Sequence, residues 1–484
     1  MKKNFITVYL PQGLKEKLEK MVVKDPPKIP SFKLEKMIYY LSLITEVPAR
    51  LKHNGITNEG FTNLYSNLLQ QVDYNYRKYL DYLIDHGIIE SDNQYITEKH
   101  KSKGYRYTYD YRVLVVPVKI YSDRLIFLLR KYHRESNAPK NEKKYKYLQK
   151  WMPGIYIDYH AAMRYIEEMF KIRQYDYTQR AYDHRKHRFK DPTDQYNSAL
   201  VNIHKIVTRN MYFFVDSTSG RLHTNLTSMP SELRGFVTYE REPLVSIDIA
   251  NSQPYLSTKL LTPSFYEKQT PSNDKKIITI KDFMKGDMKA PLLEIKGVLL
   301  PIVMSSLMSV ESEEGAVPQD VKRYNDLVYS GMLYDYLMVQ FDEQLGIKLR
   351  SRSEAKPMMF QVLFTDNRYI GQKSARPKKL FKENFPVVYD IFSIYKKGHA
   401  SLLPILLQKI EAKLILDIIT KRIAKEYPYL PIFTIHDSVV TTVGNKGIVK
   451  GIMEEELTKH IGEAPSFKIE YWNHPVIEAV NRVA

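Results

Sequence analysis

Short apolar runs in the second half of the chain predict buried strands. The run 242–250 (EPLVSIDIA) stays apolar up to Asp248, and 431–443 (PIFTIHDSVVTTV) predicts two short strands around a turn at His436, Asp437 and Ser438. An acid at a strand end and an acid in a hairpin turn can meet across adjacent strands. We therefore expect Asp248 and Asp437 to lie near each other.

Between these runs, segment 352–367 has a helical spacing of a different kind. Arg352, Lys356, Phe360 and Phe364 recur every four residues, which places them along one slowly drifting helix face. Two cations followed by two aromatics could hold a triphosphate at one end and stack against a base and sugar at the other. The alternative is an ordinary amphipathic helix, which would usually place its cations opposite its aromatic residues.

The pattern of the first 120 residues predicts a separate small module. Helical spacing covers 31–47 and 60–69, and a third helix begins near Asp73 and ends at His86. A strand follows, then a basic turn at 99–104, and an alternating strand over 105–116. This order is typical of a winged helix, and its basic tip would suit a nucleic-acid backbone through Lys99, Lys101, Lys103 and Arg106. The alternative is a solvated hairpin in a protein–protein module.

Composition narrows the class of protein. The chain has 484 residues, of which 43% are hydrophobic and 26% charged, so we expect globular domains with real cores. No apolar run approaches the roughly 20 residues that span a bilayer, and no signal peptide is evident, so we expect a cytoplasmic protein without a membrane partner. The absence of cysteine excludes disulfides and thiolate metal sites. A net charge of +18 favours a polyanionic partner such as nucleic acid.

The acids at 248 and 437 suit one particular chemistry. Phosphoryl transfer with two metal ions about 4 Å apart needs carboxylates that bridge them. Magnesium prefers carboxylate oxygens and keeps water and substrate phosphates as its other ligands. Taken alone the pair says little, because a chain with 55 acidic residues offers many pairs of aspartates.

With the flanking motifs included, the sequence resembles a known family. Segments 219–236 (SGRLHTNLTSMPSELRGF) and 243–256 (PLVSIDIANSQPYL) look like the palm of the family A DNA polymerases. That family has a Gly-Arg-Leu element, a strand ending in aspartate, an Arg-x3-Lys-x3-Phe-x3-Tyr-Gly helix and a His-Asp-Glu motif. The His-Asp-Ser sequence of this chain is also similar to that of the phage-type single-subunit RNA polymerases. The resemblance covers roughly 210–484.

The resemblance implies a role for each matching residue. Asp248 and Asp437 match the metal-binding aspartates, with Ile249 as a neighbouring ligand, and Lys356 with Arg352 matches the cations at the incoming triphosphate. The aromatic pair near the sugar and the templating base is matched by Phe360 and Phe364. The nucleic-acid contacts implied are those of Arg221 on the minor-groove side of the primer end, His436 next to the primer terminus, and Gln408 on the template.

Some positions depart from the family pattern. Phe364 and Thr365 replace Tyr-Gly, and Pro357 follows Lys356, which a helix tolerates only in its first turn. The glutamate that excludes ribose is absent from its expected place, but Gln253 lies five residues after Asp248, about where a bulky group belongs. We therefore expect Gln253 to contact the nucleotide.

These expectations define an α+β right-hand polymerase. It has an antiparallel palm sheet, helical fingers and a helical thumb, preceded by a winged-helix-like nucleic-acid-binding module. The predicted domains are 1–125 for the module, 126–235 for a helical connector and thumb, and 236–484 for the palm with fingers inserted at about 291–399. The expected cofactors are two Mg²⁺ ions, with Mn²⁺ as the alternative, and the expected partners are template-primer nucleic acid and nucleoside triphosphates.

The predicted activity is DNA synthesis from deoxynucleotides, in replication of a plasmid, phage or other mobile element. An RNA polymerase or primase of the same palm superfamily is the alternative within the enzyme class. A non-enzymatic replication initiator or regulator is the alternative outside it.

Overall fold

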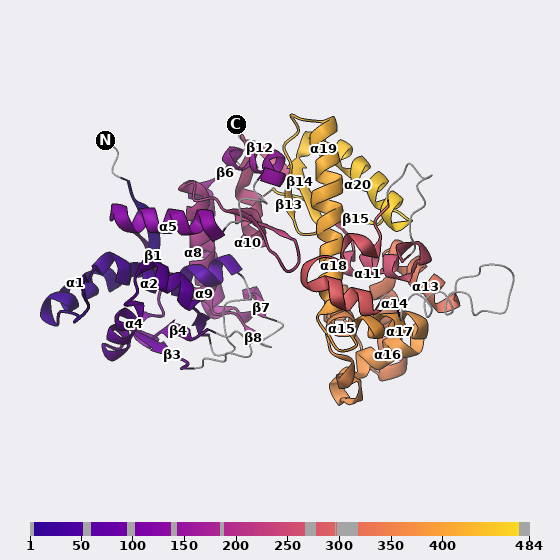
Figure 1. The fold of residues 1–484 in the computed structure, drawn as a ribbon, viewed down its shortest axis with the longest axis horizontal. Coiled ribbons are helices and arrows are strands. Elements are labelled where there is room, and N and C mark those ends of the chain that lie inside the picture. The colour runs from indigo at the N-terminus through magenta and orange to yellow at the C-terminus, as the bar shows by residue number, and fades with distance from the viewer. Residues whose placement is uncertain are drawn as a thin grey trace. The chain divides into compact units, whose positions relative to one another are not determined.

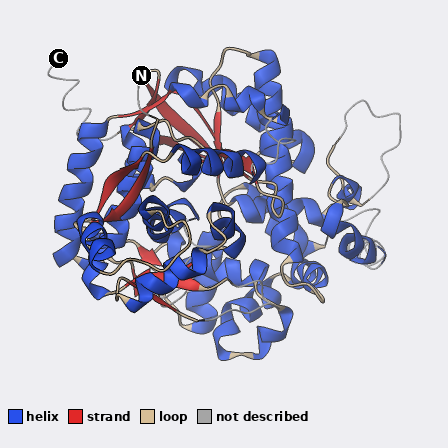
Figure 2. Ribbon diagram, turned by 60° about the vertical axis from the view of Figure 1, so that its left-hand side comes forward, coloured by secondary structure: helices blue, strands red, loops and turns tan. Residues whose placement is uncertain are grey.

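The computed structural model describes residues 4–51, 60–93, 102–136, 143–183, 188–266, 277–295, 297 and 318–473. The chain divides into two compact units, and each is described by itself. Unit 1 comprises residues 1–214, 223–241 and 472–484, and unit 2 comprises 215–222 and 242–471. The chain mixes helices with short strands (Figure 2). Among the described residues, none of the helices combines the length and apolar character that a membrane span requires.

Unit 1 begins with a strand and a helix that the sequence analysis did not predict, and the predicted helices follow. Strand β1 (Ile6–Pro11) pairs antiparallel with β5 (Val115–Ile120), and between them lie α1 (Leu14–Lys24), α2 (Leu34–Leu51), α3 (Ser66–Val72) and α4 (Tyr76–Asp85). A three-stranded antiparallel sheet has β4 (Gly104–Tyr107) between β2 (Thr62–Asn63) and β3 (Ile89–Ser91). In α4, Tyr76, Tyr79, Leu80 and Leu83 are buried, which is the predicted apolar face.

Two details of this region differ from the pattern. The segment 60–69 is not one helix, because β2 occupies Thr62–Asn63 before α3 begins at Ser66. The predicted strand over 105–116 is wrong as a single strand, since a 3₁₀ turn at Tyr109–Tyr111 separates β4 from β5. The break lets β5 leave the three-stranded sheet and pair with β1.

The rest of unit 1 is mostly helical. Its longest helices are α8 (Tyr159–Tyr175), α9 (Pro192–Val207) and α5 (Asp123–Ser136), and α8 packs against α9. The short elements are α7 (Lys146–Gln149), α10 (Asn225–Ser228), the pair β6 (Ile155–Ile157) with β11 (Val237–Tyr239), and the pair β7 (Tyr182–Asp183) with β8 (Arg188–Phe189). Strands β9 (Phe213–Val215) and β10 (Leu222–Thr224) lie where the chain passes between the units.

Unit 2 is built on an antiparallel sheet whose central strand is β12 (Glu242–Ile249). Strand β14 (Ser438–Thr442) pairs with one edge of β12 and β15 (Phe467–Tyr471) with the other, and β13 (Phe433–Ile435) pairs with β14. Residues 244–247 of β12 are all buried, as expected for a strand with a neighbour on each side and a covered face. Helix α20 (Lys446–Ile461) packs against β12 and β14. The predicted strands around Asp248 and Asp437 are therefore confirmed.

Helices make up the remainder of unit 2. They are α11 (Ser252–Ser257), α13 (Gln319–Tyr329), α14 (Leu333–Leu345), α15 (Arg352–Phe364), α16 (Arg376–Asn384), α17 (Pro386–Lys396), α18 (Leu402–Ala412) and α19 (Thr420–Glu426). A π-helical segment at Lys413–Ile419 joins α18 to α19, so the two run on as one long helix (Figure 1). Such π segments often occur at functional sites.

Candidate active site

Asp248 and Asp437 lie on adjacent strands of the unit 2 sheet. Asp248, near the end of β12, stands opposite Ser438, the first residue of β14. The backbone N–H of Ile249 donates to the carbonyl oxygen of Asp437 at 3.4 Å. Both aspartates are half-buried. The sheet therefore brings the two acids side by side at one end, as the strand pattern predicts.

A residue near each acid has a backbone conformation that favours glycine. His436, in the two-residue turn between β13 and β14, has φ 55°, and Asn251, three residues after Asp248, has φ 54°. Left-handed backbone is uncommon for residues other than glycine, although asparagine and histidine adopt it more readily than most. Two such positions flanking one pair of acids are typical of a functional site.

The two carboxylates influence each other electrostatically. Burial raises the pKa of Asp437, and the neighbouring Asp248 carboxylate raises it further, because two like charges are unfavourable at short range. A hydrogen bond from the Ser252 side chain and the charge of Arg221 oppose this rise in the pKa of Asp437. The pair thus concentrates negative charge where the side chains remain partly exposed.

This arrangement fits magnesium. Two half-buried carboxylates that repel each other would be stabilised by a divalent cation between them, and both offer the oxygen ligands that Mg²⁺ prefers. Among the described residues, no group of three or more His, Cys, Asp or Glu side chains could hold a metal ion. The remaining ligands would have to be water, backbone oxygen or substrate phosphate, which is usual for Mg²⁺ at phosphate-transfer sites.

A third carboxylate, which the sequence motifs did not identify, belongs to the same unit. Glu411 on α18 accepts a hydrogen bond from Nε of Arg221 at 2.7 Å and another from its Nη2 at 2.6 Å. The side-chain amide of Gln253, on α11, donates to the same Glu411 at 2.8 Å. Three segments that are far apart in the sequence therefore meet at one carboxylate.

Glu411 is one of the most deeply buried charged groups, with its side chain only 1% exposed. Burial raises the pKa of Glu411 to about 7, and the negative charge of Asp437 also favours the raised value, whereas Arg221 opposes it. The influence of Asp437 shows that the Glu411 network and the aspartate pair belong to one electrostatic cluster. Arg221 is the cation that compensates this cluster.

The loop that carries Arg221 is itself closely held. Gly220 has φ 73°, and a side chain there would meet the Cβ atom of Ala412 at 3.6 Å, so the loop lies directly on α18. Asp216 closes the loop by accepting hydrogen bonds from the backbone N–H groups of Ser219 and Arg221. This rigid turn presents Arg221 to Glu411.

Helix α15 carries the predicted nucleotide-binding side chains in order. Lys356 is exposed and makes no hydrogen bond or ion pair with any residue in the described part of the chain. Phe360 and Phe364 stack with ring centroids 5.2 Å apart, so these two residues share one helix face. Pro357 lies inside the helix at its sixth residue, beyond the first turn where proline is usually tolerated.

Arg352, the first residue of α15, is already paired. Its Nε donates to Asp335 on α14 at 2.8 Å, and its Nη2 lies 2.6 Å from the other carboxylate oxygen. A triphosphate would have to share this arginine with Asp335. Lys356 is therefore the better placed of the two cations to bind phosphate.

Two buried lysines hold the other end of α15. Lys396 donates to the carbonyl oxygen of Val362 at 2.6 Å, and Lys378 donates to that of Asp366 at 2.7 Å. Burial, together with the nearby charge of Lys378, lowers the pKa of Lys396 to about 7. Cations near the last carbonyls of a helix satisfy groups that lack a partner within the helix. The sequence reasoning missed both residues.

The other predicted site residues occupy varied environments. His436 is half-buried in the turn beside Asp437, Gln408 is half-buried on α18 one turn before Glu411, and Ile249 is buried. In unit 1, Lys99 and Lys101 lie outside the described residues and Lys103 is exposed. Arg106 bonds Glu90 at 2.8 Å and lies 4.1 Å from the ring centroid of Phe61.

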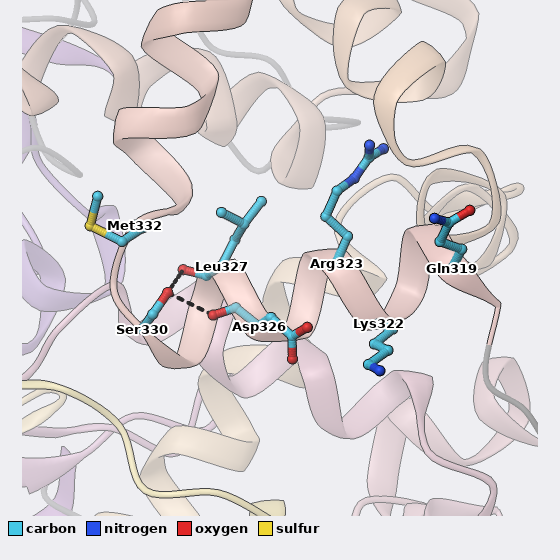
Figure 3. Close-up of a pocket in the computed structure, with 7 residues that line it drawn as sticks. All are labelled: Gln319, Lys322, Arg323, Asp326, Leu327, Ser330 and Met332. Carbon is cyan, nitrogen blue, oxygen red and sulfur yellow. Dashed lines mark hydrogen bonds between the residues drawn. The ribbon is translucent and has the colours of Figure 1, made fainter.

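A surface groove of about 490 Å³ lies along α13. Figure 3 shows its lining residues Gln319, Lys322, Arg323, Asp326, Leu327, Ser330 and Met332. None of them is a predicted site residue, but the loop after α13 borders two of the motifs. Met332 accepts a weak hydrogen bond from Arg352, and the carbonyl of Gly331 accepts one from Asn251.

Comparisons with known proteins found similarity to solved structures. No family model matches the chain, and no curated protein matches it. A similar solved structure is the POL domain of Pol1 from M. smegmatis in complex with DNA primer-template and dNTP. The identity is 14% and the TM-score 0.32, over 73% of this chain and 74% of that chain.

Proposed function

We propose that this chain is a template-directed nucleotidyltransferase that extends a primer with deoxynucleotides. The observation that carries the proposal is the pairing of Asp248 and Asp437 at one end of an antiparallel sheet, where the Asp248 carboxylate contributes to the raised pKa of Asp437. Two such carboxylates would hold divalent cations, which supply activation of a hydroxyl and stabilisation of a phosphate leaving group. Ile249 would contribute through its backbone.

The chain's own residues would then provide position and charge. Lys356, which has no partner among the residues described, offers its charge to a triphosphate, and the stacked Phe360 and Phe364 offer an aromatic surface to base and sugar. Holding the nucleotide against the primer end accounts for a large part of catalysis in reactions of this type. Arg221 and His436 would lie on the primer side, and Gln408 on the template side.

Primer extension tests this proposal. Purified protein is mixed with a primed DNA or RNA template, one nucleotide set at a time, and magnesium or manganese. Extension by deoxynucleotides on a primed template would support the proposal. Extension by ribonucleotides alone would assign the chain to the RNA polymerases or primases, and nucleic-acid binding without any extension would favour a non-enzymatic initiator.

Sugar selectivity is the first expected property of the site. Phe364 has no hydroxyl to offer a ribose, and Gln253 is bulky enough to oppose a 2′ substituent, so deoxynucleotides should be preferred. An apolar pocket rejects an added hydroxyl by only about 100-fold, and the Gln253 amide can also bond one, so we expect the preference to stay below that level. Comparing kcat/KM for matched ribo- and deoxynucleotides measures it.

Two variants locate the origin of that selectivity. Gln253→Ala should lower the preference for deoxynucleotides by removing bulk, and Phe364→Tyr should lower it by adding a hydroxyl that ribose can bond. If neither variant changes the ratio of kcat/KM values, these two residues do not contact the sugar. A wild-type preference for ribonucleotides would contradict the proposed DNA synthesis itself.

The N-terminal module is proposed to bind nucleic acid through its basic hairpin. Replacing Lys99, Lys101 and Lys103 together by alanine should weaken binding to duplex DNA and flatten its salt dependence, by about 0.9 in the logarithmic slope for each phosphate that is no longer neutralised. Catalysis on a short primed template should persist. A matched control replaces Lys15, Lys20 and Lys24 on α1, which removes the same charge from the same unit. An unchanged slope in the hairpin variant would make the module a structural or protein-binding one.

A further inference from the structure

The hydrogen bonds that join Glu411 to Arg221 and Gln253 indicate how the site selects its substrate. Gln253 is only 9% exposed, and its amide NH₂ donates to Oε2 of Glu411 at 2.8 Å. Arg221 donates one hydrogen bond to each oxygen of the same carboxylate. Because a guanidinium stays charged and has only donors, it favours the ionised form of Glu411.

This pairing fixes which end of the Gln253 amide faces Glu411. An ionised carboxylate only accepts hydrogen bonds, so Gln253 must present its NH₂ group to Glu411 and its carbonyl oxygen elsewhere. That carbonyl oxygen, Oε1, is buried and has no hydrogen-bond partner in the described part of the chain. Buried polar atoms are almost always satisfied, so an acceptor held in this way suggests that a ligand supplies the missing donor.

The place of Gln253 indicates which ligand group that donor is. Gln253 lies five residues after Asp248, on the short helix α11 that follows strand β12. Helix α11 packs against α18, the helix that carries Glu411. A nucleotide whose phosphates are held near Asp248 would bring its sugar to this side chain. The sugar of a deoxynucleotide offers its 3′-hydroxyl as a donor, and the sugar of a ribonucleotide offers a 2′-hydroxyl as well.

We propose that Glu411 is a positioning residue that turns the carbonyl oxygen of Gln253 toward the nucleotide sugar. The site then favours a 2′ substituent that can donate a hydrogen bond over one that can only accept. The inference rests on the proposed nucleotidyl transfer. The bulk of Gln253 still disfavours any 2′ substituent relative to hydrogen. Among nucleotides with a 2′ substituent, however, the orientation of the Gln253 amide determines whether a donating or an accepting substituent is used better.

A 2′-fluoro nucleotide separates these two effects, because fluorine is small and cannot donate. We expect the wild-type protein to use 2′-hydroxy nucleotides about tenfold better than 2′-fluoro nucleotides in kcat/KM, the ratio that one hydrogen bond typically supplies. In Glu411→Gln, the new amide can donate to Gln253, which lets the Gln253 amide turn over and present its NH₂ to the sugar. The ratio should then fall, because the hydroxyl loses its advantage as a donor and both substituents can only accept from the NH₂ group. The assay is run near pH 8, where Glu411 is ionised.

Two further variants distinguish an effect of the Gln253 amide orientation from a general loss of activity. Glu456→Gln is the matched control, since Glu456 is also a buried carboxylate of unit 2, paired with Arg422 at 2.9 Å, and it should leave the ratio unchanged. Gln253→Met keeps the length of the side chain but removes its acceptor, and it should lower the ratio as Glu411→Gln does. Thermal unfolding of each variant shows whether it folds.

The outcomes are distinct. A ratio that falls in Glu411→Gln and Gln253→Met, but not in Glu456→Gln, supports the proposal. A slower Glu411→Gln with an unchanged ratio would show that Glu411 is only structural, and would overturn it. If Glu411→Gln does not fold, an unchanged ratio in Gln253→Met overturns the proposal and a lowered one supports it. A wild-type protein that incorporates no deoxynucleotide would instead mean that the proposed function fails.

Discussion

Replacing either Asp248 or Asp437 by alanine should reduce nucleotide incorporation by at least about 1,000-fold, a larger loss than a single transition-state hydrogen-bond donor usually causes. Each variant removes one of the two carboxylates that would hold the catalytic cations, whereas contacts to the nucleic-acid backbone are unaffected. Binding of a primed template should therefore stay close to the wild-type level. Single-turnover incorporation and equilibrium binding, measured on the same preparations, check both parts.

Asp342→Ala provides the control for the loss of one carboxylate. Asp342 is exposed on α14 in the same unit and belongs to none of the motifs. This variant should incorporate nucleotides at the wild-type rate. Near-normal extension by Asp248→Ala or Asp437→Ala would remove that residue from the site, whatever the fold of the sheet around it.

Lys356→Ala should lower kcat/KM for the incoming nucleotide by about 100- to 1,000-fold, the usual cost of removing one preorganised group that stabilises transition-state charge. Lys356 is exposed and unpaired in the described structure, so its charge is available to a triphosphate without breaking an existing bond. Lys356→Arg keeps the charge and should recover part of the loss. Incorporation rates at increasing nucleotide concentration separate the effect on binding from the effect on the chemical step.

The matched control for Lys356 is Lys379→Ala, since Lys379 is an exposed lysine on the neighbouring helix α16. It removes one positive charge from the same unit without touching the face of α15 that carries the stacked aromatics. A similar loss of kcat/KM in both variants would mean that general electrostatic attraction, and no specific phosphate contact, accounts for the effect. A normal Lys356→Ala would exclude α15 as the nucleotide-binding helix.

The strands and the helix of the candidate site could be predicted because their patterns are regular. The apolar run up to Asp248 forms β12, and the turn at His436 separates β13 from β14. The segment from Arg352 to Phe364, with its spacing of four residues, forms α15. Local patterns specify such elements directly. The short strand β2 and the turn that separates β4 from β5 carry no comparable signal, because pairing with distant strands determines where they form.

Glu411 shows what the motif reasoning overlooked. The run 402–419 is mostly apolar, and Glu411 follows Leu403 and Leu407 at intervals of four residues, so a helix places it on the same face as two fully buried leucines. A carboxylate on a buried face needs a charged or polar partner. That spacing could have identified Glu411 as a buried charge, but the identity of its partners, Arg221 and Gln253, depends on the tertiary structure.

The roles of the lysines at the end of α15 could not be predicted for a similar reason. Lys378 and Lys396 are buried, although lysine is usually exposed, and the helices that carry them, α16 and α17, are otherwise amphipathic. The hydrogen bond of Lys396 to Val362 in the last turn of α15, and that of Lys378 to Asp366 just beyond it, form only when these helices pack together. Sequence spacing alone does not reveal such contacts.

The most direct test of the central claim is single-nucleotide incorporation opposite each of the four template bases. Wild-type protein, a primed DNA template and magnesium are combined with one deoxynucleotide at a time. We predict that the primer is extended by one residue only with the nucleotide complementary to the template, and that Asp437→Asn abolishes this extension. Extension that ignores the template base, or equal extension by Asp437→Asn, would contradict template-directed synthesis at the Asp248 and Asp437 site.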